Sequence, residues 1–340
     1  MARRRALLVV AALCAVAAVV AAIAVGEPVD WSRALTDPTS VDHAIVFGAR
    51  VPRVLLGLLV GAGLATTGAA YQGLLRNPLA EPYVLGVSGG AALGASIAIA
   101  VGSVLAIAPL ASATIVAIIA AVSGGLATLL VWALAARATT QTGREDALRG
   151  HATSILLAGV VVNAIASGAI TFVKTVVRAS TAQQLLFWLA GFLDVPTPAA
   201  LAVVAVAVTV GGALLVIDAP RLNLLTMGDE HAAHLGVDVR ALERRVFLAS
   251  SIVVGAVVAT CGMIGFVGLL VPHVVRRLVG PDHRVVLPLS LAFGGATLVA
   301  CDLIARATFR LLGTEPPVGA ITALIGGPLF LVLLSRRRVG

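Results

Sequence analysis

The chain has few charged residues. Only 12% of its 340 residues are Asp, Glu, Lys or Arg, and 59% are hydrophobic, whereas a soluble domain has about 25% charged residues. The mean hydropathy is +1.05. A chain of this composition cannot cover its surface with groups that water solvates, so the composition excludes a soluble globule and predicts an all-α integral membrane protein.

The chain has one lysine, Lys174, which follows Val173. The phosphate-binding pattern G-x-x-x-x-G-K-[ST] is therefore absent, and the chain is not expected to hydrolyse ATP itself. The metalloprotease pattern H-E-x-x-H is absent too. We expect no catalytic residue, and a membrane-embedded enzyme is the least favoured class.

Cysteine is scarce, with three residues isolated in apolar runs and no C-x-x-C pair. This pattern indicates small buried residues and no disulfide framework. His231 and His234 have a spacing that could bind a metal, but only acids lie nearby, and a solvated helix is the favoured interpretation. His273 and His283 are separated by a predicted turn. We therefore expect no metal site.

The net charge of +8 could suggest a nucleic-acid partner. The basic residues, however, lie in short clusters between long apolar runs, which is how membrane proteins fix their orientation. Nucleic acid is therefore not expected as a partner.

Uncharged runs of about 20 residues predict spanning helices. A run of 30 uncharged residues at 246–275 would form a helix about 45 Å long, so we divide it near its glycines, Gly262, Gly265 and Gly268. This gives a bundle of about ten helices over 6–26, 54–75, 82–101, 109–136, 152–173, 195–217, 246–262, 265–279, 285–306 and 316–335. All 340 residues form one transmembrane domain.

The distribution of positive charge supports this count. With ten helices both termini lie on one side, and that side has 17 Arg and Lys residues against seven on the other. The positive-inside rule makes the richer side the cytoplasm. The first apolar run is longer than the core of a signal peptide, so we favour a retained first helix.

Three features are not explained by a pattern of plain apolar spans. Residues 179–193 are too short to span and contain Trp188, which predicts an interfacial helix on the outer side. Residues 218–245 hold nine charges and form the longest cytoplasmic loop, which is large enough to carry two short helices and dock a partner. Asp302 and Arg306 share a helix face and can pair. Asp302 is taken as the only acid near the interior of a span.

Several motifs, in order along the chain, resemble one family. They are R-V-P-R at 50–53, G-A-G-L-A-T-T-G-A-A-Y-Q-G-L-L-R-N-P-L-A-E-P-Y-V-L-G-V-S-G-G-A-A-L-G-A at 61–95, L-N-L-L-T-M-G-D-E-H-A-A-H-L-G at 222–236, G-M-I-G-F-V-G-L-L-V-P-H-V-V-R-R-L-V-G-P-D-H-R at 262–284, A-C-D-L-I-A-R at 300–306 and P-V-G-A-I-T-A-L-I-G-G-P-L-F at 317–330. The ordered set resembles the FecCD-type permeases of ABC importers for iron–siderophore, haem and vitamin B12. The resemblance implies the helix bundle of a vitamin B12 importer permease. One departure is Glu315-Pro316-Pro317, where the family commonly has Glu-Leu-Pro.

The resemblance implies partners. It implies a second permease copy, with a homodimer favoured, two separate ATPase subunits on the cytoplasmic side and an external substrate-binding protein. Membrane lipid surrounds the bundle, in the cytoplasmic (inner) membrane of a bacterium. The chain would bind no cofactor, because ATP and Mg²⁺ would belong to the ATPase.

The resemblance also implies roles for residues near the two ends of the spans. Arg50, Arg53 and Arg306 would pair with glutamates of the binding protein, although membrane anchoring or the Asp302 pair is an alternative. Two segments would form the cytoplasmic gate: the loop 77–80, with Asn77 and Leu79, and the start of the fifth helix, with His151 and Thr153. A plain Asn-Pro turn is the alternative for the first of these.

The fifth and last helices would line the translocation pathway. Gly159, Asn163 and Ser167 recur on one helix face, which has polar atoms without charge and suits a bulky sliding substrate. The segment 218–240, called the coupling segment, would contact the ATPase through two short helices; the residues expected to take part are Leu222, Asn223, Gly228, Ala232, Leu235 and Gly236.

The leading hypothesis is a permease subunit that imports a metal chelate, most often a ferric siderophore, by ATP-driven alternating access. Haem or cobalamin is the alternative cargo within the same family. An ion-coupled secondary carrier is a weaker alternative, because it would require a buried acid pair that the sequence lacks.

Overall fold

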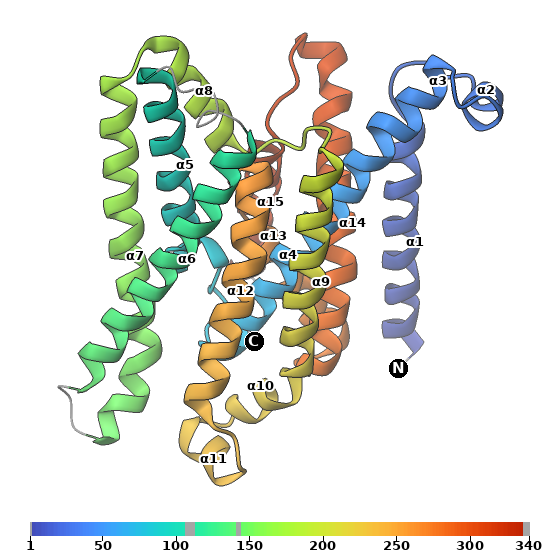
Figure 1. Ribbon diagram of the computed structural model, residues 1–340. Coiled ribbons are helices and arrows are strands. Elements are labelled where there is room, and N and C mark those ends of the chain that lie inside the picture. The colour runs from blue at the N-terminus through green and yellow to red at the C-terminus, as the bar shows by residue number, and fades with distance from the viewer. Residues whose placement is uncertain (1, 106–112, 141–143, 336–340) are drawn as a thin grey trace.

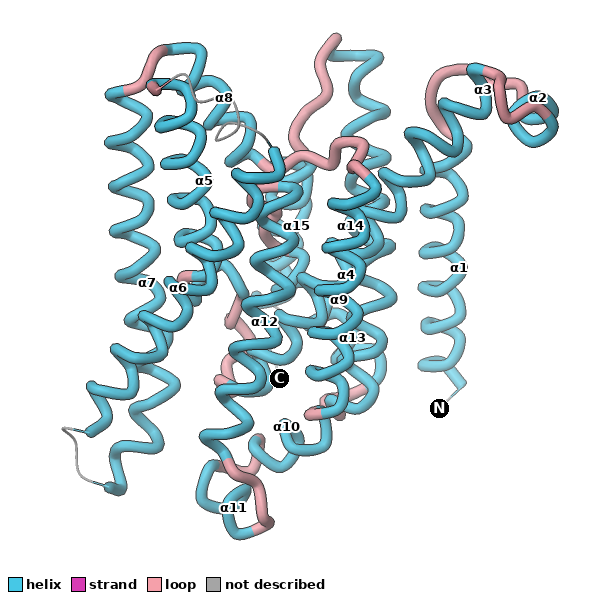
Figure 2. The backbone as a smooth tube through the Cα atoms, in the orientation of Figure 1, coloured by secondary structure: helices cyan, strands magenta, loops and turns pink. Residues whose placement is uncertain are grey.

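The structure is a computed structural model that describes residues 2–105, 113–140 and 144–335. All regular structure in these ranges is helical (Figures 1 and 2). The long helices are α1 (Ala2–Ala24), α4 (Val51–Leu74), α5 (Val87–Val104), α6 (Ala113–Thr140), α7 (Arg144–Val176), α9 (Pro198–Ile217), α12 (Val239–Cys261), α13 (Val267–Val279), α14 (His283–Leu312) and α15 (Val318–Ser335).

Short helices cover the two ends of the bundle. One end, called the α8 end, has α2 (Trp31–Thr36), α3 (Val41–His43) and α8 (Ala179–Ala190); the opposite end, called the α11 end, has α10 (Ala219–Leu225) and α11 (Asp229–His234) (Figure 1). Two further turns complete the element order: η1 (Ala44–Arg50), which runs into α4, and η2 (Pro82–Leu85), which precedes α5.

Seven of the described helices are long and apolar enough to cross a membrane, and two shorter apolar helices cover 8–24 and 318–333. The structure therefore bears out a multi-pass helical protein. The chain also turns between α12 and α13, over residues 262–266. The count of ten crossings and the side of each terminus stay predictions.

Several helix ends differ from those expected, because we used charged residues as boundaries. α12 begins at Val239 and includes three arginines of the expected cytoplasmic loop 218–245, and α7 and α14 also extend past charged residues at both ends. The expected helix 82–101 begins at Val87, after the separate turn η2. Helices can extend beyond the hydrocarbon core, where charge is not costly.

α4 lies at the centre of the bundle and packs most extensively against α14, and also against α13, α9 and α12. The close approach depends on glycine. A Cβ at Gly61 would overlap the backbone carbonyl of Gly294, and a Cβ at Gly294 would overlap that of Gly61. Between membrane helices, where lipid is as apolar as the side chains, such close backbone packing is a main source of association.

We expect Gly61→Ala to lower the free energy of unfolding by about 1–3 kcal/mol, as overpacking does. Helix propensity alone predicts the opposite sign, a gain of about 1 kcal/mol, because alanine is a better helix former than glycine. The matched control is Gly125→Ala on α6, where an added Cβ meets nothing within 4 Å. Denaturant unfolding in detergent measures both; a Gly61→Ala protein as stable as the control would contradict the packing.

Candidate functional site

A cluster of four charged residues lies where α4 and α14 meet at the α8 end. Arg53 donates from Nη2 to Asp302 Oδ1 at 2.7 Å and also contacts the Glu315 carboxylate. Arg306 Nε lies 3.1 Å from Asp302 Oδ2, which is the predicted i, i+4 pair. Asp302 is 2% exposed. The sequence paired Asp302 with one arginine, but the structure places it between two, and Glu315 completes the cluster.

Arg50, the third arginine of the expected docking set, has a different environment. It is 7% exposed and donates to the carbonyl oxygens of Ile23 at 3.1 Å, Ala24 at 3.4 Å and Glu27. The last carbonyls of α1 have no partner within their own helix, and Arg50 satisfies them. In this conformation Arg50 fixes α1 to the bundle, and its side chain is not at the surface.

The loop after α4 is held by its own residues. Asn77 Oδ1 accepts from the Leu79 backbone N–H at 2.9 Å, and Ala80 N donates to Asn77 O at 3.0 Å. Leu79, expected at the gate, is 49% exposed. The loop is thus a hydrogen-bonded Asn-Pro turn that presents one apolar side chain. The side chains of His151 and Thr153, the other expected gate residues, lie outside the described residues.

Beyond this turn the chain enters the bundle. Glu81 Oε1 accepts from the Phe266 backbone N–H at 2.7 Å, and the Tyr83 hydroxyl accepts from Ile264 N at 2.8 Å. Phe266 has a left-handed backbone, with φ of 67°, and it contacts Gly326 of α15. The prediction that Asp302 is the only acid near a span interior is therefore wrong: Glu81 is a second, brought in by the segment 75–86.

We expect Glu81→Leu to cost about 1–3 kcal/mol of stability, because it leaves the Phe266 N–H inside the bundle without its acceptor. Glu81→Gln keeps an oxygen at the same position and should stay close to the parent protein. Thermal unfolding in detergent compares the two. Equal losses would show that the charge matters and the hydrogen bond does not.

A second polar group lies closer to the α11 end. Pro272, inside α13, cannot donate to the Gly268 carbonyl, which was expected to be left free. The Gln72 side-chain amide supplies the missing donor: its Nε2 lies 3.3 Å from both Gly268 O and Leu269 O. Arg276 in turn donates to Gln72 Oε1 and to Ala69 O. The break between α12 and α13 is thus supported by side chains of the α4–α5 connection, and the proline site by Gln72 of α4.

The three expected pathway residues on α7 do not share one environment. Asn163 Nδ2 donates to Tyr83 O at 2.6 Å, and Gly159 is buried, whereas Ser167 is exposed. The first two positions therefore belong to the contact of α7 with η2 and α5. None of the three lines the cavity described below.

The segment after α9 forms two short helices at the α11 end. Leu222 and Ala232 are fully buried and hold α10 and α11 against the bundle, while Leu235 is 57% exposed and its neighbour Met227 is 63% exposed. Gly228 and Gly236 have positive φ, 109° and 86°, so the turns after both helices need glycine. Sequence reasoning missed Met227, although it lies between the two helices.

Polar contacts connect this segment to the rest of the bundle. Asn223 Nδ2 donates to Asp282 Oδ1 at 2.6 Å, and Asn223 Oδ1 accepts from His283 N at 2.8 Å. Arg76, at the start of the Asn77 turn, lies 3.0 Å from Asp229 of α11. The α13–α14 loop and the turn after α4 are therefore both attached to the coupling segment.

The Asn223 amide and the Arg284 backbone N–H hold the pKa of Asp282 below its usual value. A lowered pKa adds stability that is present above the ordinary aspartate pKa and is lost as the pH falls through the lowered one. We expect Asp282→Asn, which keeps the helix cap, to melt below the parent at pH 7. The difference should shrink as the pH falls below about 4; a difference that persists there would exclude the charge as its cause.

Among the described residues, no group of three or more His, Cys, Asp or Glu side chains is placed so that it could hold a metal ion. The sequence G-x-S-x-G occurs at Gly86–Gly90, but its serine, Ser88, is buried and donates to Tyr83 O at 3.1 Å. This hydroxyl is a structural contact at the start of α5.

Comparison with known proteins gives consistent matches. Residues 6–336 match the FecCD transport family. The cobalamin import permease BtuC of Halobacterium salinarum is 45% identical, over 87% of this chain and 75% of the relative. The hemin transport permease HmuU of Yersinia pestis is 37% identical, over 85% and 82%. A solved metal-chelate type ABC transporter, in an inward-facing conformation, superposes with a TM-score of 0.79 at 28% identity, covering 98% of this chain and 99% of that one.

Proposed function

Because the chain belongs to the FecCD transport family, we propose that it is the membrane permease subunit of an ABC importer that carries a metal chelate, with ferric siderophore as its cargo. The single observation behind this is the family match over 6–336, which spans the whole bundle together with the coupling segment. The function follows from membership and from the site. The fold alone would not assign it.

The α11 end is the cytoplasmic end in this proposal, because the excess of arginine lies there. The surface around Met227 and Leu235 is where an ATPase subunit docks. Two exposed apolar side chains on short helices, supported by the buried Leu222 and Ala232, form a rigid projection that fits into a groove of a partner. ATP and Mg²⁺ belong to that partner.

Movement of the coupling segment reaches the gate through the contacts described above. Arg76 connects α11 to the Asn77 turn, and Glu81, farther along the same segment, supports the break before α13. A displacement of α11 therefore acts on Leu79 and on the α12–α13 break together. Alternating access requires such an element with two packings, which the ATPase biases.

The charged cluster at the α8 end is the docking site for the binding protein. Arg53 and Arg306 are the cations at that surface, and Glu315, with a side chain 33% exposed, occupies Arg53 in the isolated chain. A glutamate of the binding protein has to replace Glu315 or join it. Such pairs set register and association rate more than affinity.

A second copy of the chain completes the pathway. α7 presents an exposed apolar face with Leu157, Ile165 and Phe172, and α15 presents Leu324 and Leu331. The two faces lie on the helices that were expected to line the pathway. We assign them to a homodimer in a bacterial inner membrane, with the pathway between the two copies.

The test is uptake by cells that lack the gene, with labelled ferric siderophore, haem and cobalamin measured separately. The proposal expects loss of ferric siderophore uptake and its return with the gene on a plasmid. Loss of haem or cobalamin uptake would keep the permease and replace the cargo. Unchanged uptake of all three would refute the function.

A further inference from the structure

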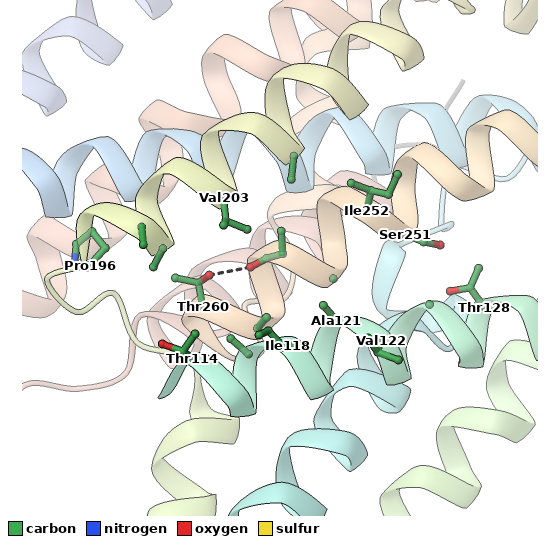
Figure 3. A pocket seen from close by; sticks show the side chains of 18 of the residues that line it. Thr114, Ile118, Ala121, Val122, Thr128, Pro196, Val203, Ser251, Ile252 and Thr260 are labelled. Atoms are coloured by element: carbon green, nitrogen blue, oxygen red, sulfur yellow. Dashed lines mark hydrogen bonds between the residues drawn. The ribbon is translucent and has the colours of Figure 1, made fainter. Parts of the chain in front are cut away.

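A groove of about 880 Å³ runs along the side of the bundle between α6, α9 and α12. Side chains of α6, such as Ile118 and Val122, face those of α9 and α12, such as Val203 and Ile252, across it (Figure 3). These four side chains are 52–60% exposed, so the groove opens to the surroundings of the bundle.

The walls of the groove suit hydrocarbon. Three of its hydroxyls donate to carbonyls of their own helices: Thr128 to Gly124 O at 3.0 Å, Ser251 to Phe247 O at 2.7 Å and Thr260 to Ala256 O at 2.9 Å. Figure 3 draws the hydrogen bond of Thr260. A hydroxyl whose proton is already used offers little to a polar ligand. The occupant of the middle of the groove is therefore an aliphatic chain.

The groove is longer than one leaflet of the bilayer. Arg244 and Thr260 both line it on α12, and 16 residues of helix rise about 24 Å. The hydrocarbon core of a bilayer is about 30 Å thick. An acyl chain that begins at one end of the groove can thus lie inside it along its full length.

Charge distinguishes the two ends of the groove. Asp194 lines the end near α8, and Arg244 lines the end near α11, where Trp132 also contributes. Both charged residues are exposed, and Arg244 forms no ion pair with a described residue, whereas the neighbouring Arg245 is held by Asp218 at 3.1 Å. A tryptophan beside a free arginine is typical of the level of lipid headgroups.

We infer that this groove binds an anionic phospholipid of the leaflet at the α11 end, with an acyl chain between α6, α9 and α12 and its phosphate at Arg244. The acid at the opposite end disfavours an anionic headgroup from the other leaflet. The site does not depend on the identity of the transported cargo, and it lies apart from the charged cluster and the coupling segment described above.

The experiment is native mass spectrometry of the full-length protein, released from vesicles of equal phosphatidylglycerol and phosphatidylethanolamine. We expect retained phosphatidylglycerol to exceed retained phosphatidylethanolamine. Arg244→Gln should lower this preference about fivefold, the effect of one basic residue near an anionic surface. Its control is Arg284→Gln, which removes an exposed arginine from the same end of the bundle outside the groove.

A second variant fills the groove. Gly125 lines it, and an added Cβ there meets nothing within 4 Å, so Gly125→Phe should fold and displace the acyl chain. Gly48→Phe is the matched control, because Gly48 of η1 is equally open and lies outside the groove. We expect retained lipid to fall with Gly125→Phe and to stay with Gly48→Phe.

Three results would overturn the inference. The first is unchanged lipid retention in both Arg244→Gln and Gly125→Phe. The second is loss with Gly125→Phe alone, which would mean a chain without a specific anionic headgroup. The third is a changed oligomeric state with Gly125→Phe at constant lipid, which would mean that a protein helix occupies the groove.

Discussion

Asp302→Ala is expected to lower the free energy of unfolding by about 3–5 kcal/mol, the cost of removing one partner from a buried ion pair. Asp302 is 2% exposed and contacts both Arg53 and Arg306. Without it, the two guanidinium groups lie close together with only the partly exposed Glu315 to balance them. Denaturant unfolding in detergent micelles measures the loss.

The matched control is Asp194→Ala. Asp194 is also near the α8 end, but it is exposed and forms no ion pair with a described residue, so its removal should change stability by less than about 0.5 kcal/mol. A loss for Asp302→Ala as small as that of the control would mean that the cluster contributes nothing to the fold. Asp302 would then be free for a direct role in transport.

Met227→Glu and Leu235→Glu are each expected to reduce ATP-driven uptake at least tenfold. Each places a carboxylate on an exposed apolar side chain of the proposed ATPase-docking surface. A buried unpaired charge at an interface costs more than about 1.4 kcal/mol, which is a factor of ten in affinity. Co-purification of the ATPase with the tagged permease should fall in parallel with uptake.

Leu35→Glu is the control for these two variants. Leu35 is 68% exposed on α2, at the opposite end of the bundle, so the same change there should leave ATPase capture intact. Normal ATPase capture by Met227→Glu and Leu235→Glu would contradict the docking surface. A variant that is expressed at the parent level but no longer captures the ATPase would show that the substitution removes docking and leaves the fold intact.

The apolar runs were sufficient to predict most of the bundle. A run of about 20 apolar residues must satisfy its backbone hydrogen bonds internally, so composition alone predicts a helix. The expected turn near Gly262 corresponds to residues 262–266, where Gly262 has a φ of 70°. The family assignment from the ordered motifs is confirmed by the match over 6–336.

Other features depend on contacts between distant segments, and local sequence does not encode them. The segment 75–86 contains Arg76, Asn77 and Glu81; residues 76–81 were taken for a cytoplasmic loop, and residues from 82 onward for the start of the next helix. Its entry into the bundle is visible only in the contacts of Glu81 with Phe266 and of Tyr83 with Ile264. A carboxylate can enter because a backbone N–H in the α12–α13 break needs an acceptor.

The pairing of the charged residues near the α8 end could not be predicted from local sequence either. Helical spacing gives Asp302 and Arg306, but Arg53 and Glu315 are separated by 262 positions in the chain. Arg50 was expected at a docking surface, and nothing in R-V-P-R indicates that its guanidinium binds the carbonyls at the end of α1. Sequence identifies which residues can pair, and packing decides which of them do.

ATP-dependent accumulation in proteoliposomes tests the central claim most directly. The vesicles would contain the permease with its ATPase subunits, with the binding protein and labelled ferric siderophore outside and ATP inside. The account predicts accumulation that requires ATP and continues after proton and sodium gradients are collapsed. Accumulation driven by an ion gradient in vesicles that contain the permease alone would contradict it, and would identify the chain as a secondary carrier.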